Sequence, residues 1–116
     1  MATVTNNVSQ VGRGFVSNHT AIFADGTQES AVKKVDLVVS SVSNISWAID
    51  TAAGYVVLSW EGSPNETFAV ISGNGRWELG KGAFRKPTGS TGKLLLTTVG
   101  FASGDTYTLI LQGAVA

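Results

Sequence analysis

Turn-forming residues recur along this chain at intervals that leave no room for ordinary helices. Short clusters rich in glycine, asparagine, serine and aspartate alternate with segments rich in valine, isoleucine, threonine and aromatic residues. Because β-branched and aromatic residues favour strands, and glycine and asparagine favour tight turns, this layout predicts an all-β chain. The clearest clusters are Asp25-Gly26, Gly62-Ser63-Pro64-Asn65, Gly73-Asn74-Gly75, Gly80 to Gly82, Gly100 and Ser103-Gly104-Asp105.

Two kinds of strand are expected between the turns. Apolar residues alternate with small or polar ones in residues 45–49, 68–70 and 107–111, which places the large side chains on one face. Residues 55–60 and 94–99 read as continuous runs instead, and we expect central strands that are buried on both sides. The predicted structural core includes Trp47, Trp60, Trp77, Tyr107 and Leu109.

The expected architecture is a single compact antiparallel β-sandwich or barrel of about seven to nine short strands. A chain of 116 residues and 12.0 kDa has room for one core only. Residues 27–35 mix helix-favouring and strand-favouring side chains, and we expect a strand from residue 31 onward. Residues 1–18 are polar and are expected to form an N-terminal arm before a β-domain of residues 19–116.

Composition bounds the possible partners. Eight basic and eight acidic residues cancel, so no net field attracts nucleic acid or a membrane surface. The absence of cysteine excludes disulfides and thiolate metal sites. The first residues do not resemble a secretion signal, and no stretch approaches the roughly 18 apolar residues of a membrane span, so we expect a protein that stays in the cytoplasm of its host. Only 14% of residues are charged, where about a quarter is usual, which suggests that a partner covers part of the surface.

One stretch imitates a phosphate-binding loop. Residues 75–82, "GRWELGKG", match the pattern GxxxxGK followed by Ser or Thr except at Gly82, which has no hydroxyl group for magnesium. A phosphate-binding loop must also open a helix, whereas the following residues lead to Pro87. A β-hairpin with glycine-rich ends is the favoured interpretation.

Catalytic and metal-binding groups do not cluster in the sequence. The single histidine, His19, cannot form a metal site alone, and no spacing gives it an orienting partner, so a surface or packing role is favoured. The eight carboxylates are scattered and mostly lie in or beside turns. We therefore expect no enzymatic activity and no cofactor.

Positive charge does gather in residues 76–93, where five basic residues accompany one acid, Glu78. Three interpretations of this basic cluster remain open. It could be a set of solvated charges at a strand edge, a face that docks another protein or, as the least favoured interpretation, a nucleic-acid site. Trp47 and Trp60 could stack on sugars, but both lie in strongly apolar segments, and packing in the core is the favoured interpretation. The candidate docking residues are Arg13, Lys81, Arg85, Lys86 and Lys93.

Four stretches of the sequence carry a family resemblance. They are "DGTQESAVKKVDL" (25–37), "YVVLSWEG" (55–62), "ISGNGRWELG" (71–80) and "TGKLLLTTVGFASGDTYTLILQ" (91–112). In this order they resemble a family of small virion structural proteins of tailed bacteriophages, especially marine ones. Many relatives end in a basic tail, whereas this chain ends in Gly-Ala-Val-Ala.

The resemblance implies a capsid decoration, or cement, protein. Such a protein binds the major capsid protein on the outer surface of the head, often as a trimer, and stabilises contacts between capsomers. A homo-oligomer in the virion, assembled in the host cytoplasm, is thus expected. Two alternatives stay open: a structural component of the tail or neck, and a carbohydrate-binding or host-surface-binding module that exposes a tryptophan.

Overall fold

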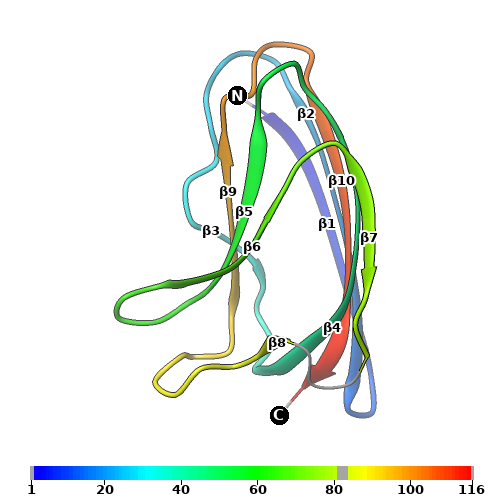
Figure 1. Cartoon of the computed structure of the whole chain (residues 1–116), viewed down its shortest axis with the longest axis vertical. Helices are drawn as coiled ribbons and strands as arrows, with labels where there is room; N and C mark the ends of the chain where they lie inside the picture. Colours follow the sequence, from blue (N-terminus) through cyan, green and yellow to red (C-terminus); the bar gives the residue numbers. More distant parts are fainter. Residues whose placement is uncertain (1, 81–83, 116) are drawn as a thin grey trace.

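The computed structural model describes residues 2–80 and 84–115, which form two antiparallel sheets packed face to face (Figure 1). The first sheet has the order β1-β2-β10-β4-β7, with β8 also paired to β4. Its strands are β1 (Ala2–Val11), β2 (Gly14–Phe23), β4 (Val39–Asp50), β7 (Asn74–Glu78), β8 (Phe84–Arg85) and β10 (Thr106–Val115). The second sheet has the order β3-β9-β5-β6 and consists of β3 (Val32–Val35), β5 (Tyr55–Trp60), β6 (Glu66–Ile71) and β9 (Leu94–Val99).

The predicted fold class is confirmed. The described residues contain no helix and form ten strands, slightly more than expected because residues 2–18 also form strands. Side chains of both sheets meet in one apolar core, in which Trp60, Tyr107 and Leu109 are 1–2% exposed. Alternating burial along β2 and β10 supplies the core face of the first sheet, as period-two patterning requires.

The two runs expected to be buried on both sides behave differently. In β9, which lies between β3 and β5, Leu94, Leu95 and Leu96 are all buried. In β5 burial alternates, and Tyr55 at its start is 39% exposed. β5 is a central strand, between β9 and β6, as predicted, but the expected burial on both sides is wrong for it, because one face of the strand is partly exposed to solvent.

The expected N-terminal arm is also wrong for the residues that the structure describes. Residues 2–11 form β1, which pairs with β2 along its whole length, and the boundary expected at residue 18 falls inside β2. A two-residue turn with Gly12 at a φ of 59° joins the strands, and glycine at the first turn position is typical of a type II′ hairpin. The composition of β1 is polar because it is an edge strand, of which Val4 packs against the core.

A row of aromatic rings joins the sheets on the side of β6, β7 and β8. Neighbouring ring centroids lie 5.0 Å apart for Trp47 and Trp77, 6.1 Å for Trp77 and Phe84, 5.4 Å for Phe84 and Phe68, and 5.3 Å for Phe68 and Trp60. Phe68 belongs to the second sheet and Phe84 to the first, so this pair bridges the sandwich. Trp60 is buried, while Trp47 and Trp77 are partly buried against the core.

Candidate functional site: the uncharged face

The outer face of the first sheet carries few charges. Inward-facing residues of its strands enter the core, so the alternate residues face solvent in rows set by the strand register. Over β1, β2, β10 and most of β4 these rows contain neutral polar and aliphatic side chains. We call the following set the uncharged face: Thr3, Thr5, Asn7, Ser9, Val11, Val16, Asn18, Thr20, Ile22, Asn44, Ser46, Ala48, Thr106, Thr108, Ile110 and Gln112.

Charged side chains lie at the margins of this face. Asp50 lies at the end of β4 opposite Thr106, and on β7 the guanidinium group of Arg76 is paired with the carboxylate of Glu78. Three aliphatic side chains on the face are well exposed: Val11 at 84%, Ile22 at 60% and Val16 at 42%. A surface of this kind can be covered without removing ions from water, which is the costly step in forming an interface.

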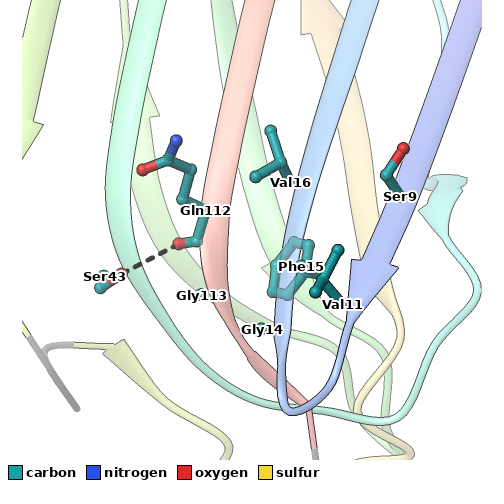
Figure 2. Close-up of a pocket in the computed structure, with 8 residues that line it drawn as sticks. All are labelled: Ser9, Val11, Gly14, Phe15, Val16, Ser43, Gln112 and Gly113. Atoms are coloured by element: carbon teal, nitrogen blue, oxygen red, sulfur yellow. Dashed lines mark hydrogen bonds between the residues drawn. The ribbon is translucent and has the colours of Figure 1, made fainter.

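One end of the uncharged face is hollowed (Figure 2). The hollow has a volume of about 370 Å³ and lies between Val11, Val16 and Ser9 on one side and Gln112 and Ser43 on the other. Its lining also includes Phe15, Gly14 and Gly113.

The hollow owes its shape to an irregularity between β10 and β4. The register shifts between Gln112 and Gly113, and Ser43 is the extra residue of β4 at that point. A Cβ atom at Gly113 would overlap the carbonyl oxygen of Ser41, so a glycine is required there. The Ser43 hydroxyl donates a hydrogen bond to the Gln112 carbonyl at 3.3 Å, which fixes the rim.

A second hollow, of about 470 Å³, adjoins the first and shares Gly14, Ser43 and Gly113 with it. It contains Arg13, one of the predicted docking residues, which lies in the turn between β1 and β2. The carbonyl of Arg13 accepts a hydrogen bond from the amide of Val115 at 2.7 Å, which ties this turn to the end of β10.

The other predicted docking residues do not share one surface with Arg13. Arg85 lies in β8 opposite Ser41, and Lys93 precedes β9 of the opposite sheet, with its Nζ 2.9 Å from Asp36 Oδ1. Lys86 Nζ donates to the Ser90 carbonyl at 3.4 Å, and Lys81 lies outside the described residues. The basic stretch is thus divided between the two sheets and partly ion-paired.

A third, smaller hollow of about 240 Å³ lies on the uncharged face next to β7 and is lined by Ser46, Trp47, Ala48, Gly75, Arg76, Thr108 and Ile110. The side chain of Trp47 itself points to the core side of the sheet, like that of its partner Leu109. Its indole Nε1 donates to the carbonyl of Ser72 at 3.0 Å. The ring occupies the space that a side chain at Gly75 would need. Trp47 is thereby held in one position, with part of the ring accessible.

The titratable groups inside the sandwich have structural partners. His19 is buried in β2, with Nδ1 2.9 Å from Asn6 Oδ1 and Nε2 2.9 Å from Ser17 Oγ. Burial, and secondarily the positive charge of Lys34, lower the pKa of His19 from 6.5 to about 4, so the ring is neutral near pH 7. Histidine therefore has the packing role here.

Within residues 2–80 and 84–115, no three histidine or carboxylate side chains converge in a way that could hold a metal ion. The same part of the chain has no helix of the length and apolar character needed to cross a membrane.

Comparisons with known proteins assign no family to this chain. No family model matches the chain, and no curated protein matches it. Among solved structures, the fold is similar to that of a protein from Bacillus endospore appendages, described as a family of disulfide-linked pili, at 12% identity and a TM-score of 0.40. That alignment covers 100% of this chain and 92% of the other.

Proposed function

We propose that this chain is a non-enzymatic structural protein of a tailed-phage virion that decorates the head. It binds the major capsid protein on the outer capsid surface through the uncharged face and stabilises contacts between capsomers. The observation that carries the proposal is the breadth of this face, which extends over β1, β2, β10 and β4 as far as Asp50 with no charged side chain in between.

A repeating shell suits such a surface. Neutral threonine, serine and asparagine side chains supply hydrogen bonds, and the exposed Val11, Val16 and Ile22 supply apolar contact. Arg13, at the end of the face beside the hollows, adds one cation at the rim. Because a shell offers many equivalent sites, a modest contact at each is enough for dense coverage when copies are linked.

Pelleting with capsids tests the proposal. Undecorated expanded heads are mixed with purified protein, and the bound fraction is measured for the natural chain and for Val16→Lys. A lysine at this position buries a charge in the contact, so we expect affinity to fall roughly tenfold or more. Val70→Lys is the matched control, since Val70 is 56% exposed on β6 of the other sheet. Equal binding by all three proteins would contradict docking through the uncharged face.

Immunogold labelling of intact particles tests the location separately. Label over the head is expected. Label restricted to the tail would replace the decoration proposal with a structural component of the tail or neck.

The partly accessible Trp47 favours one function of a different class, a carbohydrate-binding or host-surface-binding module. Its ring lies on the core side of the sheet, packed against the core but partly accessible, and an accessible aromatic ring can stack on a sugar. Under this alternative, soluble glycans protect the protein from iodide quenching, and Trp47→Phe removes that protection. Unchanged quenching with glycans present would exclude it.

A further inference from the structure

The outer edge of β1 is open. Among the described residues, β1 pairs with β2 alone. The amide of Phe23 donates to the carbonyl of Asp105, and the amide of Gly104 donates to the carbonyl of Phe23, so the odd-numbered residues of β2 bond toward β10. Even-numbered residues of β2 therefore bond to the odd-numbered residues of β1 opposite them. The amides and carbonyls of Val4, Asn6, Val8 and Gln10 consequently point toward the open edge.

The other sheet edges carry features that prevent strand addition. β3 has four residues, two of them lysines, and a register irregularity. β6 begins with Glu66 and contains a register irregularity against β5. β7 has five residues, including Arg76 and Glu78. Short length, charge and bulges are the usual protections of an edge strand.

β1 has none of these protections. It is ten residues long, regular in its pairing with β2, and contains no charged residue, no proline and no glycine. An edge of this length and character is a template for another strand, because unpaired main-chain donors and acceptors gain partners when a strand is added.

We propose that β1 pairs antiparallel with β1 of a second copy, across a two-fold axis at Asn6, so that the first sheet continues from one copy into the other. The proposal is independent of capsid binding. A second copy is the occupant because the edge is self-complementary: in this register Val4 faces the partner's Val8, Thr5 faces the partner's Asn7, and no like charges meet.

Two-fold pairing also limits the assembly. The contact is isologous, so the β1 edge of each copy is fully paired with the β1 edge of the other. The assembly therefore stops at two copies. A trimer, which the family resemblance implies, would need β1 to pair with a different edge, and β7 is protected by its charges. The uncharged faces of the two copies become continuous across the axis.

Sedimentation equilibrium of the full-length protein over a concentration series up to about 1 mM tests the proposal. The natural chain is expected to approach twice its 12.0 kDa mass. Val8→Lys places a charge on the edge, and Val8→Pro removes an edge-facing amide without affecting a bond to β2, so both are expected to stay at the single-chain mass. Val16→Lys adds the same charge on the neighbouring strand, away from the edge, and is expected to dimerise normally.

Three outcomes would overturn the proposal: a single-chain mass for the natural protein, a threefold mass, or a dimer that survives both Val8 variants. Circular dichroism of each variant confirms that loss of the dimer is not loss of the fold. A dimer that is lost in Val16→Lys but kept in Val8→Lys would assign the contact to the uncharged face instead.

Cysteine cross-linking tests the register, since the chain has no cysteine of its own. With the axis at Asn6, the two copies of an Asn6→Cys variant face each other in a hydrogen-bonded pair with Cα atoms about 5.5 Å apart, a distance that a disulfide can bridge. The Cα atoms of two Asn7→Cys residues would lie beyond the roughly 7 Å limit. We expect Asn6→Cys to form a covalent dimer under mild oxidation and Asn7→Cys to remain largely monomeric on a denaturing gel; the reverse result would overturn this register.

Discussion

The Nζ atom of Lys34 lies 2.6 Å from Oε2 of Glu29 inside the sandwich, where the two side chains are 2% and 11% exposed. The other carboxylate oxygen of Glu29 accepts a hydrogen bond from the Tyr107 hydroxyl at 2.5 Å. Burial and this hydrogen bond raise the pKa of Tyr107 above its ordinary value of 10.0. The carboxylate of Glu29 therefore has two partners, and the loss of either one leaves a polar group without that partner in a place largely shielded from water.

Lys34→Met is expected to destabilise the protein by about 3 kcal/mol, because it leaves the Glu29 carboxylate buried without its cation. Urea unfolding at pH 7 measures this. The double variant Lys34→Met with Glu29→Gln should recover part of the loss, since a neutral amide can still accept from Tyr107. Lys33→Met is the control: Lys33 pairs with Glu61 at 3.4 Å but is 42% exposed, so its removal should change stability little. Equal losses for Lys33 and Lys34 would contradict a special role for the buried pair.

The buried His19 predicts a loss of stability in mild acid. Its folded-state pKa of about 4 lies below the ordinary 6.5, so the unfolded chain binds a proton more readily and acid favours unfolding. The loss begins as pH falls through 6.5 and reaches about 3 kcal/mol near pH 4. Unfolding free energies measured at pH 7.5, 6.0 and 5.0 should decrease in that order.

His19→Gln isolates this effect, because glutamine remains neutral and can still bond to Ser17 and Asn6. The variant should have nearly flat stability between pH 7 and 5. Hydrogen bonds and nearby lysines lower the pKa values of Asp36 and Glu61 below 3.8 and 4.5, so these carboxylates contribute only at more acidic pH. An unchanged slope in the His19 variant between pH 7 and 5 would assign the sensitivity to another group.

Phe68 is expected to link the two sheets. Its ring contacts Trp60 of its own sheet and Phe84 of the other, at centroid distances of 5.3 and 5.4 Å. Phe68→Ala should lower the free energy of unfolding by about 2 kcal/mol or more and shift the emission of the neighbouring tryptophan to longer wavelength. Val70→Ala on the same strand, where the valine is 56% exposed, should cost little and leave the emission unchanged. A similar cost for both substitutions would mean that the aromatic row does not join the sheets.

The sequence predicts those parts of the fold in which local pattern and burial agree. Alternation in residues 107–111 marks the core face of β10, and Asp105 accepts a hydrogen bond from the Ala102 amide at 2.8 Å in the turn expected from Ser103-Gly104-Asp105. β1 fails this test because its side chains face solvent on both sides over most of its length. Nothing apolar therefore marks it as a strand, although the glycine of its hairpin turn is a usable signal.

The candidate site could be found only with the topology. Charge clusters are visible in a sequence, but the uncharged face is defined by the absence of charge on one side of four strands. The β1–β2 hairpin, β4 and β10 supply these strands, and the three segments are separated along the chain. The bulge that shapes the hollow arises from the pairing of Gly113 with a strand some seventy residues earlier. Strand pairing of this range depends on tertiary packing, which local propensity does not encode.

The bulge at Gly113 gives the last prediction. A Cβ atom there would overlap the carbonyl oxygen of Ser41 and lie 2.9 Å from the Phe15 ring, and because a backbone atom cannot move aside cheaply, β10 and β4 would have to separate. Gly113→Ala should therefore destabilise the protein by about 2–3 kcal/mol or more, measured by urea unfolding. Gly14→Ala is the matched control in the same hollow, since its nearest contact would be an ordinary 3.5 Å to the Val11 carbonyl oxygen, and it should cost far less. If the two alanine variants were equally stable, the close approach of β10 to β4 would not be the feature that shapes this end of the face.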